Sequence, residues 1–166
     1  MQLRAYTKED AKTICSWVRT EEELYRWSAD QFNKFPLQAE DMEAYYAPRM
    51  AEGAYFPLVM VDDEGKPVGH FIIRHPGHED ASTYRFGFIV ADPEIRGKGY
   101  GRQMLTLGLA FAKEHLQATR ITLGVFANND RARHCYEAVG FREYGRRQCE
   151  LPVGTWECIE MEYRFA

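Results

Sequence analysis

Residues 84–102, YRFGFIVADPEIRGKGYGR, decide how this 166-residue chain is organised. The first half is rich in aromatic and aliphatic residues like a strand, and a short loop follows at Pro93. Gly97, Gly99 and Gly101 then lead into an apolar pattern of helical spacing. Glycines let a backbone approach a ligand closely, and a helix N-terminus favours an anion. The stretch therefore predicts a site for a phosphate-bearing cofactor.

The glycine spacing fits neither of two common phosphate-binding patterns. A dinucleotide-binding loop has the spacing G-x-G-x-x-G after the first strand of a parallel unit, whereas residues 97–101 read G-x-G-x-G after a predicted antiparallel hairpin. A Walker loop would close with Gly-Lys-Ser or Gly-Lys-Thr, which this stretch lacks. A dinucleotide-dependent enzyme remains a rival hypothesis, and it predicts binding of NAD(H) and no protection by coenzyme A.

Hydrophobic periodicity along the chain predicts a mixed α/β domain spanning residues 1–166. The longest predicted helix presents one apolar face, made of Met104, Leu107, Gly108, Phe111 and Ala112. An antiparallel meander comes first and a strand–helix–strand–helix unit follows it. Strands are expected at residues 3–6, 56–61, 68–74, 83–90, 121–125, 141–150 and 159–165, and helices at residues 8–18, 39–52, 99–116 and 128–139. Residues 21–30 are expected to form a short helical or irregular piece.

The composition is that of an ordinary globular protein, with 45% hydrophobic and 28% charged residues. No apolar run approaches the length of a membrane span, and the first ten residues lack the apolar core of a signal peptide, so we expect no membrane partner and a cytoplasmic location. The net charge of −4 and the absence of a basic stripe argue against a nucleic-acid partner. The spacing of the four cysteines matches no metal or redox motif, which favours free thiols.

Charge is distributed unevenly along the chain. Residues 1–80 carry 9 Lys or Arg and 15 Asp or Glu, while residues 81–166 carry 12 and 10. The more basic half holds the glycine turn, which fits an anionic cofactor there and a cationic partner on the other half. A merely skewed set of solvated surface charges would give the same numbers.

Two motifs in this order resemble the GNAT superfamily of N-acetyltransferases. Residues 96–101 read R-x-x-G-x-G, the acyl-CoA signature of that family. Residues 129–132 read N-x-x-A and residues 136–141 read Y-x-x-x-G-F, which match its second motif. The resemblance covers residues 55–165, and the N-terminal helices more loosely. It implies a central, mostly antiparallel sheet of about six or seven strands, flanked by helices and splayed between the fourth and fifth strands.

The resemblance implies acetyl-CoA as co-substrate and no metal, and it leaves open whether the acyl group is acetyl or longer. The glycine loop would hold the pyrophosphate, and the edge of the fourth strand would pair with the pantetheine arm. Arg131 and Arg133 are candidates for the ribose phosphate, although a solvated helix face explains them equally well. The expected cofactor-binding residues are Phe88, Ile89, Val90, Arg96, Gly97, Lys98, Gly99, Tyr100, Gly101, Arg102 and Asn129.

Tyr136 is the candidate catalytic residue. The resemblance places this tyrosine beside the thioester sulfur, where a phenol can protonate the departing thiolate. From the residues alone, Tyr136 is better explained as part of an apolar helix stripe with Ala132 and Val139. Asn129 is similarly ambiguous, because capping the helix would suffice to explain it.

The general base is not assigned by the sequence. Many family members carry a glutamate on the fourth strand where this chain has Arg85, which cannot accept a proton at neutral pH. Glu23, Asp30, a water chain or no base at all remain open, and Arg85 alternatively indicates an acceptor that bears a carboxylate. His75 and His78 could suggest a metal, but a solvated turn is the favoured interpretation.

We therefore expect an acetyl-CoA-dependent N-acetyltransferase in which an amine attacks directly within a ternary complex. The acceptor is a small-molecule or peptide amine, and the acidic N-terminal half favours a cationic small molecule. Aromatic residues such as Trp17, Trp27 and Tyr45 are expected to line its pocket in part. The alternative is a non-catalytic acyl-CoA-binding or sensor protein of the same fold. Because members of this family often form dimers, the resemblance also implies a possible homodimer.

Overall fold

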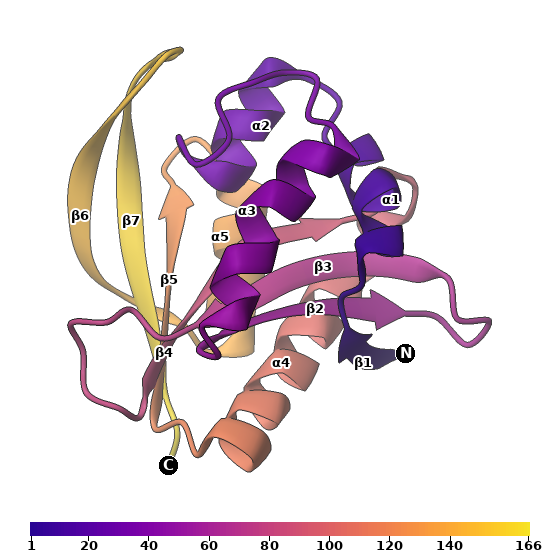
Figure 1. The fold of residues 1–166 in the computed structure, drawn as a ribbon. Helices are drawn as coiled ribbons and strands as arrows, with labels where there is room; N and C mark the ends of the chain where they lie inside the picture. Colours follow the sequence, from indigo (N-terminus) through magenta and orange to yellow (C-terminus); the bar gives the residue numbers. More distant parts are fainter.

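Seven strands form one sheet in the order β1-β2-β3-β4-β5-β7-β6 in the computed structural model, which describes residues 1–166 (Figure 1). Every neighbouring pair is antiparallel except β4 and β5, which are parallel. The predicted mixed, mostly antiparallel architecture is thus confirmed. The strands are β1 Gln2–Ala5, β2 Tyr55–Val61, β3 Pro67–Arg74, β4 Thr83–Ala91, β5 Arg120–Phe126, β6 Arg142–Leu151 and β7 Gly154–Arg164.

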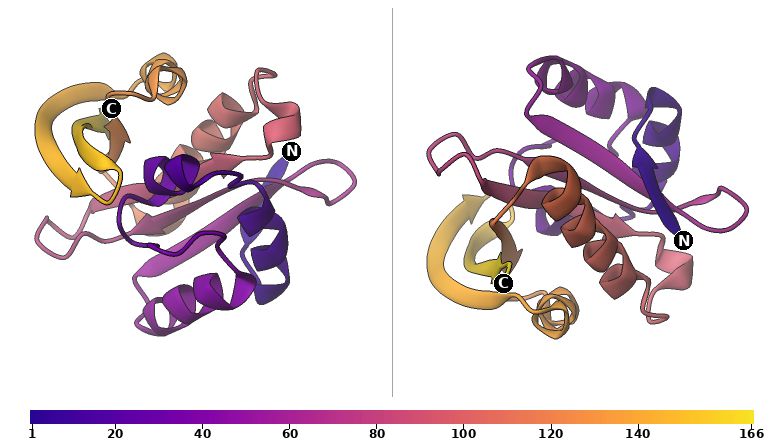
Figure 2. Two further views of the ribbon diagram at one scale, coloured as in Figure 1. Left: turned by 90° about the horizontal axis from the view of Figure 1, so that it is seen from above. Right: turned by 90° about the horizontal axis from the view of Figure 1, so that it is seen from below.

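Helices cover both faces of the sheet. The first three lie against one face, and α4 and α5 lie against the other (Figure 2). The helices are α1 Ala11–Ser16, α2 Glu21–Ser28, α3 Ala39–Ala51, α4 Tyr100–Leu116 and α5 Asp130–Val139. The helix expected at residues 8–18 is shorter, because a 3-10 turn at Lys8–Asp10 precedes α1.

Alternation along the strands divides the core into two clusters. Leu58 and Met60 of β2 pack under α4, whereas Val59 and Val61 pack under α1–α3. This division follows from the period of two in a strand, which sends successive side chains to opposite faces. The expected face of α4 is partly wrong, because Leu105 and Leu109 are buried while Leu107 and Phe111 only pack against the cluster from its edge.

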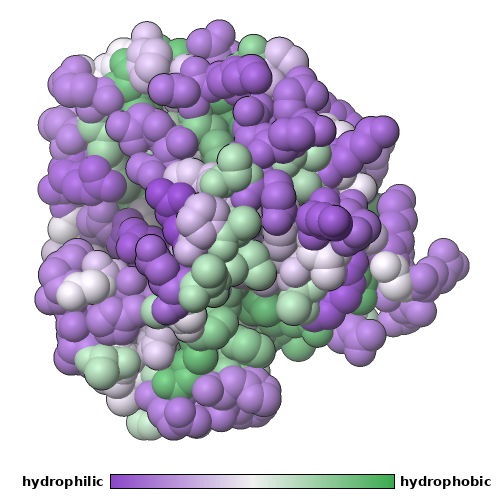
Figure 3. All heavy atoms as spheres, in the orientation of Figure 1, coloured by the Kyte–Doolittle hydropathy of each residue, from purple (hydrophilic) through white to green (hydrophobic).

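The outer surface of the face that carries α2 and α3 is largely hydrophilic, and hydrophobic residues gather near its centre and lower edge (Figure 3). None of the helices has both the length and the apolar character that crossing a membrane requires.

A buried polar pair joins α3 to the sheet beneath it. His70 of β3 is fully buried, and its Nδ1 donates to the Leu58 carbonyl oxygen at 2.8 Å. Its Nε2 is then the acceptor for the Tyr46 hydroxyl at 2.7 Å. This pattern requires a neutral imidazole. Burial, which the hydrogen bond to Leu58 only partly offsets, lowers the pKa of His70 to about 4.

The low pKa of His70 predicts a pH-dependent stability. Between the ordinary imidazole value of 6.5 and about 4, the unfolded chain binds a proton that the folded chain does not. We therefore expect the free energy of unfolding to fall by roughly 3 kcal/mol as the pH is lowered through this window. Urea titrations at a series of pH values measure this dependence. The free energy of unfolding of His70→Gln should depend much less on pH, whereas His115→Gln, at an exposed site, should keep the native pH dependence. The same pH dependence in both variants would refute the assignment.

Candidate active site

The site is built where β4 and β5 part. The two strands pair only at Thr83, Tyr84 and Arg85, after which β5 continues against β7 alone. In β4, Phe88 has a positive φ of 51°, and the register with β3 shifts between the pairs Ile72–Gly87 and His70–Val90. This bulge bends the strand and leaves its edge from Phe86 onward without a strand partner on the β5 side.

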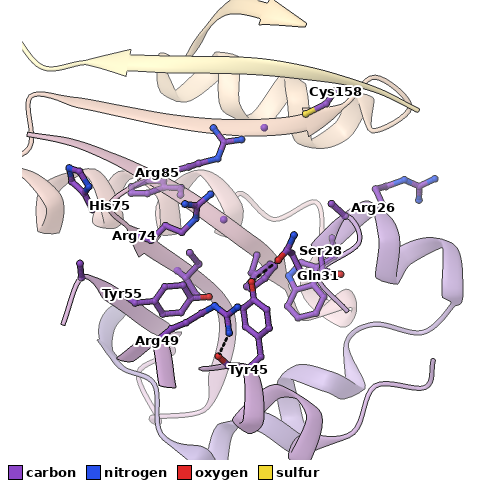
Figure 4. A pocket seen from close by; sticks show the side chains of 18 of the residues that line it. Arg26, Ser28, Gln31, Tyr45, Arg49, Tyr55, Arg74, His75, Arg85 and Cys158 are labelled. Atoms are coloured by element: carbon purple, nitrogen blue, oxygen red, sulfur yellow. Dashed lines mark hydrogen bonds between the residues drawn. The ribbon is translucent and has the colours of Figure 1, made fainter. Parts of the chain in front are cut away.

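A cavity of about 520 Å³ lies on the α2–α3 face of the sheet at this gap (Figure 4). Phe88 contributes to its wall together with aromatic residues of the N-terminal helices. The ring centroids of Trp27 and Tyr45 lie 5.3 Å and 5.7 Å from that of Phe88. Of the cofactor-binding and catalytic residues predicted from the sequence, Phe88 alone lines this cavity. Trp27 and Tyr45 line it as expected, whereas Trp17 is buried in the core.

The glycine loop lies at the start of α4. Gly97 and Gly99 have φ values of 84° and 82°, a conformation that other residues adopt only with strain. Gly99 stands at the N-cap, and no side chain caps the first turn. The N–H groups of that turn are therefore free to bind an anion. Arg96, Lys98 and Arg102, all exposed, lie beside this turn in the sequence.

The third glycine lies beside α5. A Cβ atom at Gly101 would lie 3.4 Å from the Cys135 sulfur, an ordinary contact distance, so packing against α5 does not by itself require glycine here. Tyr100 packs against the core cluster under α4. Backbone conformation thus accounts for Gly97 and Gly99, and not for Gly101.

Tyr136 is buried on α5 in the cluster beneath α4, and its ring packs edge-on against Phe141 at 6.4 Å. Burial, with a smaller effect of Cys135, raises the pKa of Tyr136 well above its ordinary value. The phenol is therefore protonated at neutral pH, as a proton donor must be. Both the packing role and a donor role are compatible with this position.

Three polar residues near the start of α5 differ in how they are bound by the rest of the protein. Asn129 caps the helix, because its Oδ1 accepts from the Ala132 backbone N–H at 3.4 Å. Arg133 is engaged by neighbours on its own helix, Asp130 and Glu137. Arg131 is exposed and makes no ion pair, which leaves it the freer of the two candidates for the ribose phosphate.

A cluster of charged groups spans the gap between the parting strands. The Nη1 of Arg85 donates to Glu160 of β7 at 2.9 Å and to Thr122 at 3.3 Å. Arg147 of β6 donates to the other oxygen of Glu160 at 2.9 Å. Gly124 leaves room for this arrangement, because a Cβ there would lie 2.9 Å from the Arg85 guanidinium.

The carboxylate of that cluster is unsuited to act as a base. Burial alone would raise the pKa of Glu160, but the charge of Arg85 and hydrogen bonds from both arginines lower it below its ordinary value. Glu23 accepts from the Arg19 backbone N–H at 2.7 Å, and neither it nor Asp30 lines the cavity. Glu52 is the only Asp or Glu in the wall, and it is exposed.

His75 and His78, for which the sequence favours a solvated turn over a metal site, belong to a turn. Nε2 of His75 donates to the Asp80 carbonyl oxygen at 2.9 Å, and its Nδ1 accepts from Gly77 at 3.0 Å. His78 is exposed, and its Nδ1 lies 3.1 Å from the Pro76 carbonyl oxygen. Nowhere do three His, Cys, Asp or Glu side chains gather closely enough to hold a metal ion.

Sequence reasoning missed several polar residues of the cavity wall: Arg26, Arg49, Tyr55, Arg74 and Arg147. They come from α2, α3, β2, β3 and β6, and only the register of the sheet and the placement of the helices bring them together. One signal was available, since Arg74 lies two residues after Ile72 and so faces the same covered side of β3.

Comparison with known proteins agrees with this architecture. The family model described as the acetyltransferase (GNAT) family matches residues 21–141. The spermidine N(1)-acetyltransferase of Vibrio cholerae is 26% identical over 164 residues, covering 98% of this chain and 91% of that protein. The peptidyl-lysine N-acetyltransferase YjaB of Escherichia coli is 26% identical over 161 residues, covering 96% and 94%.

A solved structure has the same fold. The crystal structure of the Vibrio cholerae spermidine N-acetyltransferase in complex with CoA and spermine superposes with a TM-score of 0.83 at 21% identity, covering 98% of this chain and 94% of that one. Because the family model spans most of the chain and includes both motifs, the protein belongs to the GNAT family of acetyltransferases.

The two ion pairs of Glu160 predict that removing its carboxylate lowers the stability of the protein. Glu160→Gln would leave two arginines facing each other across the gap without a carboxylate, and we expect the free energy of unfolding to fall by about 2 kcal/mol in urea titrations. Glu143→Gln is the matched control, because its carboxylate pairs with Arg146 at an exposed position and should cost below about 1 kcal/mol. Losses of the same size in both variants would contradict a structural role for Glu160.

Proposed function

We propose that this protein transfers an acetyl group from acetyl-CoA to a primary amine. The observation that carries the proposal is the open edge of β4, which begins at the gap and leads toward the glycine loop at the start of α4. In this arrangement the pyrophosphate binds the N–H groups around Gly97 and Gly99. The pantetheine arm pairs with residues 88–90 in the manner of an added strand.

Acetyl transfer then proceeds in one ternary complex. The amine nitrogen attacks the thioester carbonyl carbon, a C–N bond forms, and the C–S bond breaks. The leaving thiolate takes a proton from the hydroxyl of Tyr136, which is protonated at neutral pH. The attacking nitrogen loses a proton to water, and the Tyr136 phenolate regains one from water, so that the protons balance. The products are an amide and free coenzyme A.

No side chain of the cavity is assigned as general base. The carboxylate of Glu160 is held by two arginines, and both nitrogens of His75 are engaged in its turn. The amine accordingly binds in its neutral form or gives its proton to water. A cytoplasmic location, a homodimer and a single domain over residues 1–166 remain predictions from the sequence.

The acceptor class is the finer question. The named relatives act on spermidine or on peptide lysines, so both small amines and peptides fall within the range for this chain. The acidic N-terminal half of the sequence favours a cationic small molecule. The charges that line the cavity do not favour it, since of the acidic residues in that half only Glu52 reaches the wall.

Tyr136→Phe tests the chemical step. Loss of the phenol proton should lower kcat by about 100-fold or more and leave the KM for acetyl-CoA nearly unchanged. Free-thiol release with a panel of amines measures both constants. Tyr144→Phe, at an exposed tyrosine of β6, should keep full activity. A Tyr136→Phe enzyme within about threefold of the native kcat would remove Tyr136 from the mechanism, and coenzyme A binding without turnover of any amine would refute the transferase.

Gly99→Ala tests the pyrophosphate loop. An alanine at a φ of 82° costs roughly 1–2 kcal/mol and disturbs the N–H groups that bind phosphate. We expect the KM for acetyl-CoA to rise about tenfold or more. Gly65→Ala is the matched control, because Gly65 has a φ of 81° in the turn between β2 and β3, equally free of neighbours. Both variants should lose similar stability, and an equal change in KM would argue against the loop.

A further inference from the structure

The cavity wall carries an excess of positive charge. Its basic residues are Arg26, Arg49, Arg74, Arg85 and Arg147, and Glu52 is its only carboxylate. Three of these arginines have carboxylate partners within the protein: Arg85 and Arg147 share Glu160, and Arg26 pairs with Glu22. Arg49 and Arg74 make no ion pair. Two guanidinium groups therefore line the cavity without an ion-pair partner.

Arg74 is held against another cation by the register of the sheet. Tyr55, Arg74 and Arg85 are direct neighbours across β2, β3 and β4, so their side chains share one face (Figure 4). Like charges directly opposite each other destabilise a sheet. Burial, and then the charge of Arg85, lowers the pKa of Arg74. Glu160 compensates Arg85, and an anion bound in the cavity would do the same for Arg74.

Arg49 is positioned for the same ligand. Its Nη1 donates to the Tyr45 carbonyl oxygen at 2.7 Å, and its guanidinium lies 3.5 Å above the centre of the Tyr45 ring. These contacts fix the group and leave further N–H donors available, since a guanidinium has five.

Two other residues of the cavity wall carry a hydrogen-bond donor that has no acceptor. The Tyr55 hydroxyl and the Trp27 Nε1 are buried without a hydrogen-bond partner. Leaving a buried donor unpaired is costly, and a ligand oxygen would relieve that cost. Cations and neutral donors thus line one cavity, which is a pattern for an oxyanion.

We infer that the acceptor amine carries a carboxylate, which Arg74 and Arg49 bind with the Tyr55 hydroxyl. This inference rests on the proposed acetyl transfer and specifies its substrate as an amino acid. A planar guanidinium matches a carboxylate with two parallel hydrogen bonds. The volume of about 520 Å³ suits a small ligand, and the rings of Trp27 and Phe88 provide a wall for an apolar side chain. A polyamine would bring more positive charge to an uncompensated cationic wall.

Matched acceptors test the inference directly. L-Phenylalanine, L-phenylalaninamide, phenethylamine and spermidine are compared by free-thiol release with saturating acetyl-CoA. We expect kcat/KM for the amino acid to exceed that for its amide by about tenfold or more, with spermidine the poorest. Equal or better turnover of the amide, phenethylamine or spermidine would overturn the inference and leave the transferase intact.

Substitutions of Arg74 and Arg49 test whether these residues bind the carboxylate. Arg74→Gln and Arg49→Gln should each raise the KM for L-phenylalanine about tenfold or more and leave that for the amide unchanged, with partial rescue by Arg74→Lys. Arg164→Gln, an exposed arginine outside the cavity wall, is the matched control. The melting temperature of Arg74→Gln should be unchanged or higher, because a like-charge contact is removed. A KM effect equal for acid and amide would assign Arg74 a structural role instead.

A binding experiment separates this inference from the proposed function. Calorimetry of N-acetyl-L-phenylalanine with the coenzyme A complex reports carboxylate recognition without turnover. Binding that Arg74→Gln weakens about tenfold or more supports the carboxylate site, whether or not any amine is acetylated. If amines are acetylated while this product and its amide bind equally, the carboxylate site is refuted and acetyl transfer stands.

Discussion

The parting of β4 and β5 is the constraint on which the site depends. Beyond the Arg85–Thr122 pair the edge of β4 has no strand neighbour, and the bulge at Phe88 turns it further from regular pairing. Backbone groups at such an edge need partners, and an extended ligand supplies them by adding as a strand. In the proposed acetyl transfer, a thioester laid along the open edge of β4 meets an amine held in the cavity on the α2–α3 face.

An arginine, Arg85, lies in this gap at the position where many family members carry a glutamate that acts as base. Arg85 lies between the strands because Gly124 leaves room for it, and Glu160 neutralises it. A partly buried ion pair of this kind contributes little net stability, since desolvation offsets the attraction. Its effect is on position and on proton affinity, because the same arginines that hold Glu160 lower the pKa of its carboxyl group. The proposed acetyl transfer therefore relies on the amine, the thioester and the Tyr136 phenol, and not on a carboxylate in the gap.

The sequence was sufficient for whatever is encoded locally. The glycine loop, the Asn129 cap and the alternation of the last strand each depend on residues close together in the chain, and the structure agrees with all three. The fold class followed from the order of these elements and from the two motifs. The exact buried face of α4 was missed, because Leu105 and Leu109 are selected by the strands beneath the helix and not by periodicity alone. The cavity wall depends on register between distant strands, which places Tyr55 beside Arg74 and Arg74 beside Arg85.

Net charge along the sequence proved a poor guide to the charge of the cavity. Residues 1–80 are acidic overall, yet their contribution to the wall includes Arg26, Arg49 and Arg74 against Glu52 alone. The reason is geometric. Most acidic groups of that half lie on outward faces, where water and salt screen them, whereas the arginines lie where side chains converge and the dielectric is low. A ligand interacts most strongly with the charges that it contacts directly, so the arginines of the wall, and not the net charge of residues 1–80, are the basis of the proposed carboxylate recognition.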